Sequence, residues 1–362
     1  MPRIDGLFDE LAKRGGSDLH LAAGYPPLAR IRGELVALRE AAIEASELEE
    51  TLVEILTPTQ RARLAADLDL DFGHSHRGEA RFRVTYFTKS SGVGAVFRLV
   101  PTRVRTLAEL GCPEVLWRLA DRRSGLVIVT GPTGAGKSTT LAAMVDHINK
   151  TRACHILTIE DPVEFVHEPL RAQITHREVG VHAPTFAAAM RSAGRENPDV
   201  VVVGELRTPE VLKLALQLAS CGLLVFATSH TNGAAPTLER MINSFAAEEQ
   251  SQVRGMLADS LVGLVAQQLL TAADGKGRVA VHEILIGSPA VSALVREGKT
   301  GQLTSLMQAG QAQGMQTMDM ALERLLTQSK IAAEDALDSA VDREMFAQVI
   351  ARVRPDLAEI LA

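Results

Sequence analysis

The chain has 362 residues, too many for one ordinary hydrophobic core, so we expect two or more domains. Its net charge of −6 argues against a strongly basic general nucleic-acid binder, although a local basic channel is compatible with it. Three scattered cysteines without a C-x-x-C pair suit a reducing cytoplasm, where each would be a small buried hydrophobe.

The N-terminus and the apolar runs predict no direct membrane insertion. Three acidic residues occur within the first ten, and no apolar core of a signal peptide follows them. The longest apolar candidate, Leu261 to Ala273, is interrupted by Gln267 and Gln268 and is too short to span a bilayer. Any association with a membrane would therefore come through partners.

Residues 1–100 are predicted to form a small α/β domain. Apolar residues at helical spacing predict helices over 4–14, 47–56 and 58–67. Alternation and turn residues predict extended segments at 17–21, 28–38 with a turn at 32–34, 80–87 and 94–100. On such strands alone, Arg81, Arg83 and Arg98 are expected on a solvated polar face.

Residues 101–113 are predicted to be a linker, beyond which apolar strands alternate with helices. This pattern over 114–288 predicts a RecA-like α/β core with a parallel sheet. The predicted strands are 126–129, 155–159, 200–203, 223–228 and 279–286, and the predicted helices are 137–149, 186–192, 211–219 and 248–270. Residues 289–362 are predicted to form a helical C-terminal segment.

A glycine-rich stretch follows the first strand of this core. Residues 131 to 139 read Gly-Pro-Thr-Gly-Ala-Gly-Lys-Ser-Thr between an apolar strand and a predicted helix, the context of a phosphate-binding loop. We expect Lys137 to reach the β- and γ-phosphates of ATP and Ser138 to offer its hydroxyl to Mg²⁺. The expected cofactor-binding residues of the loop are Gly131, Thr133, Gly134, Gly136, Lys137, Ser138 and Thr139.

Carboxylates follow two later strands at their carboxyl ends, where ligands of such sheets bind. Glu160 and Glu164 follow the 155–159 strand in the sequence Glu-Asp-Pro-Val-Glu, which could also be a solvated turn. Glu205 follows the strand 200–203 in a Walker B arrangement, where an acid that orients water or Mg²⁺ belongs. The sequence therefore predicts catalytic roles for Glu160, Glu164 and Glu205, and a metal role for Glu205 together with Ser138.

Basic side chains accompany these acids. His230 follows the 223–228 strand, and the sequence supports equally a structural role and a role in sensing the γ-phosphate. Arg191, Arg195 and Arg207 flank the Walker B strand, where arginines can neutralise charge in phosphoryl transfer. Single arginines on helices are more often surface residues.

Several separate motifs together resemble the secretion ATPases of type II secretion and type IV pili, and within them the PilT-type retraction motors. The matching segments are Gly-Ser-Asp-Leu-His-Leu at 16–21, the arginine-bearing strands at 80–84 and 94–98, the Walker A loop at 131–140, an Asp box at 159–167, a Walker B at 197–205, a His box at 227–232 and Gly-Met-Gln-Thr-Met-Asp at 314–319.

The resemblance implies a PAS-like N-terminal domain and a RecA-like C-terminal domain in a hexameric ring, with ATP between the domains and against a neighbouring subunit. It implies hydrolytic roles for Glu164, with Glu160 nearby, and Glu205, and it favours functional roles for His230 and for Arg81, Arg83 and Arg98. It also implies a cytoplasmic protein at the inner face of the inner membrane, with a platform protein of the pilus machine and a paralogous motor as partners.

Some positions depart from the family pattern. Leu223 stands where the family has a second histidine, Asn197 where it has aspartate, and Thr208 where it has an acid. The late family signature A-I-R-N-L-I-R-E, which the resemblance links to retraction, reads Ala-Val-Ser-Ala-Leu-Val-Arg-Glu at 290–297. The ATPase motifs are therefore intact while the output segment is altered.

Three functions follow as hypotheses. The first is an ATP-hydrolysing hexameric motor that retracts a type IV pilus. The second is an accessory or regulatory paralogue, similar to PilU, with weak or no retraction activity of its own. The third is a nucleic-acid motor, against which the acidic net charge and the lack of a DNA-binding motif both count.

Overall fold

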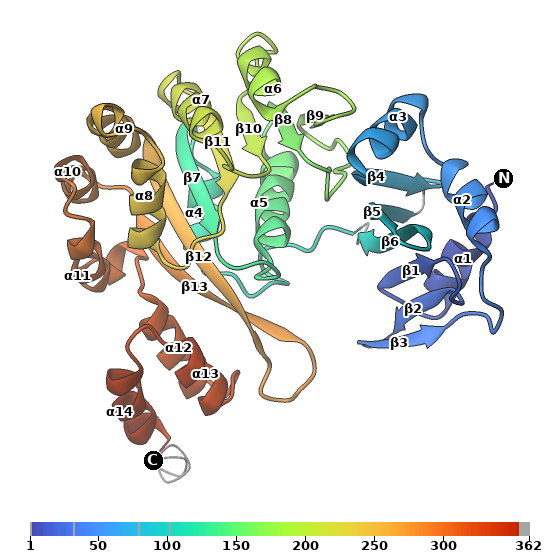
Figure 1. Cartoon of the computed structure of the whole chain (residues 1–362). Coiled ribbons are helices and arrows are strands. Elements are labelled where there is room, and N and C mark those ends of the chain that lie inside the picture. Colours follow the sequence, from blue (N-terminus) through green and yellow to red (C-terminus); the bar gives the residue numbers. More distant parts are fainter. Residues whose placement is uncertain (1, 32, 79, 101–102, 355–362) are drawn as a thin grey trace. The chain divides into compact units, whose positions relative to one another are not determined.

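The structure is a computed structural model that describes residues 2–31, 33–78, 80–100 and 103–354. It divides into two compact units (Figure 1). Unit 1 comprises Met1–Arg103 and the short segment Asp161–Val166, and unit 2 comprises Val104–Glu160 and His167–Ala362. The sequence did not predict that residues 161–166, which follow a strand of unit 2, would belong to unit 1. Residues 101–102 of the predicted linker and 355–362 of the predicted C-terminal segment lie outside the described residues.

Unit 1 is an antiparallel sheet with helices, in the order β3-β2-β1-β6-β5-β4. Its strands are β1 (Asp18–Ala22), β2 (Leu28–Ile31), β3 (Glu34–Ala37), β4 (Asp69–His76), β5 (Ala80–Lys89) and β6 (Gly92–Val100). Its helices are α1 (Asp5–Lys13), α2 (Ala45–Val53) and α3 (Pro58–Asp67). The alternation of β5 predicted its buried face, where Phe82 stacks on Phe8 of α1 at a ring distance of 4.3 Å.

Unit 2 is built on a sheet in the order β13-β12-β7-β11-β10-β8-β9, with every neighbouring pair parallel except β12 and β13. Its strands are β7 (Gly125–Thr130), β8 (His155–Glu160), β9 (Gln173–Glu178), β10 (Val200–Val203), β11 (Leu224–Thr228), β12 (Leu261–Thr271) and β13 (Arg278–Ile286). Strands β7, β10 and β11 are wholly buried because apolar clusters cover both faces of the sheet.

Helices surround this sheet. They are α4 (Val115–Ala120), α5 (Lys137–Thr151), α6 (Phe186–Ala193), α7 (Pro209–Ser220), α8 (Ala234–Asn243) and α9 (Ala247–Ser260). Leu107, inside the predicted linker, is buried in the same core as α4, so the second half of 101–113 packs as part of unit 2. The predicted mixed α/β fold with a RecA-like core is confirmed, and the loop follows β7, an interior strand between β12 and β11.

The predicted helix over 248–270 is wrong in its second half. Helix α9 ends at Ser260, and the chain continues as β12, which pairs with β7 on one side and β13 on the other. The run after Ser260 is apolar without a helical period, and pairing on two sides outweighs local helix propensity. Strands β4 and β9 and helices α4 and α8 were also not predicted from the sequence.

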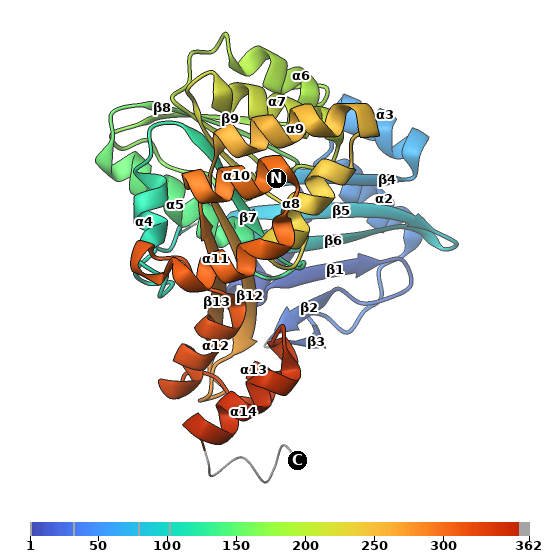
Figure 2. The same cartoon turned by 90° about the vertical axis from the view of Figure 1, so that its left-hand side faces the viewer.

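The described part of the C-terminal segment is helical, as predicted. It contains α10 (Pro289–Glu297), α11 (Leu303–Ala309), α12 (Met318–Thr327), α13 (Ala333–Ser339) and the unpredicted α14 (Arg343–Val353). Helix α10 packs on α9, whereas α12, α13 and α14 share a separate small core with β13 (Figure 2). Among the described residues, no helix combines the length and the apolar character needed to cross a membrane.

Truncation of the core of unit 1 should destabilise the protein strongly. Phe97 is fully buried against Phe8 and Tyr86, so we expect Phe97→Ala to lower the free energy of unfolding of unit 1 by about 3–5 kcal/mol in urea titrations. Leu35 on β3 is 48% exposed, and Leu35→Ala should change the same quantity by less than about 0.5 kcal/mol. Equal losses in the two variants would contradict the assignment of the core.

Candidate functional site: a phosphate-binding loop with an acid, a histidine and an arginine

The loop between β7 and α5 has the backbone that a phosphate-binding loop needs. Gly131, Gly134 and Gly136 have φ angles of 146°, 83° and 82°, a region that favours glycine. A Cβ on Gly131 would lie only 2.2 Å from the carbonyl oxygen of Gln267, so this position also excludes side chains by space. Helix α5 then begins at Lys137, with its N-terminal N–H groups facing the loop.

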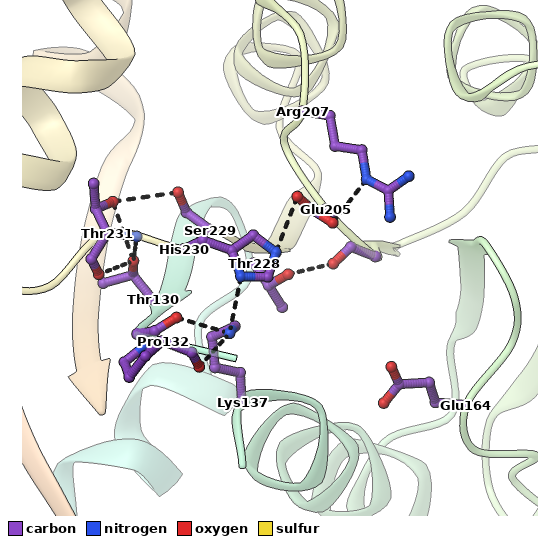
Figure 3. Close-up of polar contacts among 12 residues, drawn as sticks. Thr130, Pro132, Lys137, Glu164, Glu205, Arg207, Thr228, Ser229, His230 and Thr231 are labelled. Atoms are coloured by element: carbon purple, nitrogen blue, oxygen red, sulfur yellow. Dashed lines mark hydrogen bonds and ion pairs between the residues drawn. The ribbon is translucent and has the colours of Figure 1, made fainter. Parts of the chain in front are cut away.

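The Lys137 ammonium group joins this loop to the end of another strand. Its Nζ donates to the carbonyl oxygens of Gly131 at 2.8 Å and Pro132 at 3.0 Å, and it lies 3.4 Å from Nδ1 of His230 (Figure 3). Only 7% of Lys137 is exposed, so its charge acts in a region of reduced dielectric. The arrangement suits an ammonium group that binds phosphate oxygens.

His230 connects Lys137 to the Walker B acid. Its Nε2 lies 3.0 Å from Oε1 of Glu205, and Arg207 Nε donates to the other carboxylate oxygen at 2.8 Å. Burial opposes ionisation of Glu205, but hydrogen bonds from Arg207 and His230 outweigh it and hold the pKa of this carboxyl below its usual value. Lys137, His230, Glu205 and Arg207 thus form one chain of polar contacts (Figure 3).

The loop that carries His230 is fastened to the strand of the phosphate-binding loop. Thr130, the last residue of β7, donates through Oγ1 to the carbonyl oxygen of Thr231 at 2.6 Å, and the N–H of Thr231 donates back to that hydroxyl at 3.1 Å. Thr228 Oγ1 donates to the carbonyl oxygen of Gly204, next to Glu205. The ends of β7, β10 and β11 therefore hold His230 and Glu205 in fixed register.

The remaining predicted residues of this unit lie at the same strand ends. Glu160 is the last residue of β8, and a Cβ on Gly204 would lie 3.2 Å from its Cα, so Glu160 neighbours the Walker B turn. Ser138 and Thr139 are half-buried in the first turn of α5, and Thr133 is exposed in the loop. Arg191 pairs with Glu210 at 2.5 Å, and Arg195 donates to the backbone of Arg191, so these two arginines have structural partners.

Two of the predicted arginines of unit 1, Arg83 and Arg98, lie in a row across its sheet, whereas Arg81 lies two residues before Arg83 on β5 and is opposite Val100. Arg83 on β5 is directly opposite Arg98 on β6, Arg98 is opposite Asp18 on β1, and Asp18 is opposite Arg30 on β2. Arg98 Nε donates to Asp18 at 2.8 Å. Burial opposes ionisation of Asp18, but hydrogen bonds from Arg98 and Ser17 hold its pKa below the usual value. The sequence pattern pointed to the arginines and gave no role to this buried acid, although it lies within the Ser-Asp-Leu-His signature.

Glu164 belongs to unit 1 and contacts the same row. Arg83 Nη1 lies 3.5 Å from Oε1 of Glu164, and Arg81 Nε donates to the carbonyl oxygen of Val163 at 3.1 Å. The predicted catalytic residues are therefore divided, with Glu164 in unit 1 and Glu160, Glu205 and His230 in unit 2.

Gln267 is a site residue that sequence analysis missed. Its Nε2 donates to the carbonyl oxygen of Ala135 at 2.6 Å, and its Oε1 accepts from Thr140 Oγ1 at 2.8 Å. Its own backbone closes the space beside Gly131. A buried amide in β12 thus braces both sides of the phosphate-binding loop. The signal in the sequence was a polar pair, Gln267 and Gln268, inside an apolar run.

A family model described as Type II/IV secretion system protein matches residues 3–336. The chain belongs to this family. It is 47% identical to the Type IV pilus retractation ATPase PilT of Pseudomonas aeruginosa over 95% of this chain and 99% of that protein. It is also 40% identical to the Type IV pilus ATPase PilU of the same organism, over 95% of this chain and 91% of that protein.

Solved structures of such proteins share the fold. The crystal structure of the pilus retraction motor PilT with bound ADP is 39% identical, covers 94% of this chain and 98% of its own, and superposes with a TM-score of 0.87. The ATPase DotB of Legionella pneumophila is 26% identical, covers 97% and 96%, and gives a TM-score of 0.82. Membership of this secretion ATPase family, with use of a nucleotide, is therefore established for the chain.

The structure explains one departure from the family pattern and shows where two others lie. Asn197 has a φ of 50°, and asparagine tolerates this left-handed region better than most residues. Leu223 directly precedes β11 while His230 follows its end, so the missing second histidine lies at the opposite end of that strand from the Lys137 network. Ser292 in α10 donates to the carbonyl oxygen of Ala258 at 2.5 Å, so the altered late signature forms a helix bonded to α9.

The brace from β12 can be tested by removing its amide. Gln267→Leu keeps a similar volume but leaves Ala135 and Thr140 without their partners, so we expect the dissociation constant for ADP to rise about tenfold in calorimetry. Gln268, its neighbour in β12, makes no such bond to the loop among the described residues, and Gln268→Leu should stay within about twofold of the unmodified protein. Equal affinities for the two variants would contradict the role of Gln267.

Proposed function

We propose that this chain is an ATP-hydrolysing motor that powers retraction of a type IV pilus. The observation that carries the proposal is the contact chain from Lys137 through His230 to Glu205, at the end of three neighbouring parallel strands. The names of the similar proteins PilT and Twitching motility protein, the latter 46% identical and from Neisseria gonorrhoeae, support the biological role. The 39% identical PilT structure with bound ADP supports nucleotide turnover.

In this proposal the phosphates of ATP lie in the loop 131–136. Phosphate oxygens replace the carbonyl oxygens of Gly131 and Pro132 as partners of the Lys137 ammonium group, and the backbone N–H groups at the start of α5 bind the remaining oxygens. Thr133, Gly134, Gly136 and Thr139 complete the loop around them. Because Lys137 is buried, its charge stabilises the negative charge that develops on the transferred phosphoryl group.

Mg²⁺ is the proposed cation, with Ser138 and Glu205 as its protein ligands. The described residues contain no preformed group of three or more His, Cys, Asp or Glu side chains that could hold a metal. A hydroxyl group and one carboxylate nevertheless fit Mg²⁺, which usually binds one or two protein oxygens together with substrate phosphates. When bound with ATP, the ion would neutralise charge between the β- and γ-phosphates.

The acids then divide the remaining work. Glu205 is ionised at neutral pH, as its lowered pKa requires despite its partial burial, so it can accept hydrogen bonds from water near the γ-phosphate. His230 contacts both Lys137 and Glu205, and a movement of Lys137 towards a phosphate would change the partners of His230. We propose that Glu164, with Glu160 beside the Walker B turn, serves hydrolysis as well.

Several finer points of the proposal rest on the resemblance to the family. We propose that Arg81, Arg83 and Arg98 contribute positive charge to the nucleotide, that the chain forms a homohexameric ring, and that it works in the cytoplasm at the inner face of the inner membrane. The proposed partners are further copies of this chain, a platform protein of the pilus machine and a paralogous motor.

The accessory role remains the second candidate. The 40% identity to PilU and the altered helix α10, where Ser292 and Ala293 replace an Arg-Asn pair of the retraction signature, favour it. Both candidates would use the same Lys137, His230 and Glu205 contacts, so they differ in the rate at which the chain alone turns over ATP and in its output, and not in the residues of the nucleotide site.

Substitutions in the contact chain should separate binding from turnover. We expect Lys137→Ala to abolish measurable ATPase activity, because the main cation facing the γ-phosphate is lost. Glu205→Gln should keep ADP affinity within about threefold while lowering kcat by about 10²–10³, since the group acts mainly in the transition state. Glu210→Gln, an exposed acid that pairs with Arg191, is the matched control and should retain full turnover. Normal ATP turnover in Lys137→Ala would contradict the assignment of this site as the ATPase site.

The two candidate outputs can be separated in the cell and in the test tube. For a primary motor we expect a deletion strain to lose twitching and the purified protein to turn over ATP at about 1 s⁻¹ or faster, within the usual range of enzymes. An accessory paralogue should show weak turnover alone and a gain on addition of the partner motor. Stimulation of the ATPase activity by single-stranded DNA would instead favour the hypothesis of a nucleic-acid motor.

A further inference from the structure

One buried carboxylate joins two helices of unit 2. Glu283 lies in β13 and is 7% exposed. Its Oε1 accepts from the N–H of Ala234, the first residue of α8, at 2.6 Å, and its Oε2 accepts from the N–H of Met318, the first residue of α12, at 3.3 Å. Both contacts are at helix N-termini, where the helix dipole favours a negative charge.

The first of these helices is tied to the nucleotide loop. Helix α8 begins shortly after His230, and its N-cap Gly233 has a φ of 91° and supplies no side-chain cap. Thr237 in its first turn donates to the carbonyl oxygen of Gly233 at 2.6 Å and lies 3.5 Å from the hydroxyl of Thr130. Glu283 therefore caps a helix whose first turn lies against Thr130, the residue that fastens the His230 loop.

The second helix begins in the late segment 314–319. Gln316 forms a two-way backbone bridge with Ile284, at 2.8 and 3.1 Å, and its side chain donates to the carbonyl oxygen of His282 at 2.6 Å. Helix α12 continues from there into the small core shared with α13 and α14. The position of α12 is thus fixed relative to β13 on both sides of Glu283.

A carboxylate is chemically suited to this junction. Both of its partners are N–H donors, so the side chain must accept two hydrogen bonds, and an amide offers only one acceptor oxygen. Burial holds the pKa of Glu283 above its ordinary value, and the bonds from Ala234 and Met318 offset this only in part. Loss of either donor would leave a buried acceptor unpaired, so the two helix starts depend on each other through this group.

We infer that Glu283 is a positioning residue that couples the His230 loop to the C-terminal helices, by holding the first turns of α8 and α12 on one carboxyl group. A nucleotide that shifts His230 changes the start of α8, and the shared carboxylate passes the change to α12. The inference rests on the proposed nucleotide site and is independent of pilus retraction.

Hydrogen exchange with and without ADP tests this coupling on the whole chain. In the unmodified protein, ADP should change the protection of amides at the starts of both α8 and α12. In Glu283→Gln we expect ADP affinity within about threefold, the change at α8 retained, and the change at α12 reduced to less than about one third. The matched control Glu323→Gln removes a half-buried charge on α12 that pairs with Arg352, and it should retain both changes.

Two results would overturn the inference. The first is binding of ADP to the unmodified protein without any change at α12, and this result decides the matter even if Glu283→Gln does not fold. The second is a full change at α12 in a folded Glu283→Gln variant. Failure of the unmodified protein to bind ADP would overturn the proposed function as well, so the binding measurement distinguishes the two failures.

Discussion

The Lys137 ammonium group is hydrogen-bonded both to the loop that would hold phosphate and to the histidine beside the Walker B acid, and the ends of β7, β10 and β11 bring these groups together. The loop can pack closely against Gln267 of β12 because Gly131 and Gly136 have positive φ angles and no side chains. Gly131 lies against the backbone of Gln267, and Gly136 lies against its side chain. The histidine is in reach because Thr130 fastens the His230 loop to the end of β7. A buried charge with several partners is costly to leave unpaired, which makes this group sensitive to what occupies the loop.

Two buried acids, Asp18 and Glu283, likewise hold several hydrogen-bonding groups together in other parts of the molecule. In unit 1, Asp18 lies between Arg30 and Arg98 in a row across four strands, and it keeps like charges from repelling one another on a single face. In unit 2, Glu283 holds two helix starts. Neither acid belongs to a nucleotide motif. Asp18 lies within the signature at 16–21, but its pairing with arginines is visible only once the strands are aligned, and Glu283 lies in none of the motifs.

Much of the fold and of the site was predictable because it is written in local patterns. The strand, glycine turn and helix around Lys137 have a fixed spacing, and polar residues end or closely follow the apolar runs of β7, β10 and β11 at the same edge of a parallel sheet. The predicted helix over 248–270 failed for the opposite reason. Residues 261–271 form a strand because β7 and β13 supply hydrogen-bonding backbone partners on its two sides. The local sequence pattern contains no information on these partners.

The sequence by itself determined that this chain has a nucleotide-binding loop, a Walker B acid and an arginine-bearing first domain, because each depends on residue types at short spacing. Only the tertiary structure decided that residues 161–166 pack with unit 1, that Gln267 braces the loop from more than a hundred residues away in the chain, and that Glu283 joins α8 to α12. These are contacts between distant segments, made when hydrogen-bonding groups are buried together, and the need to pair such groups is visible only once the chain is folded.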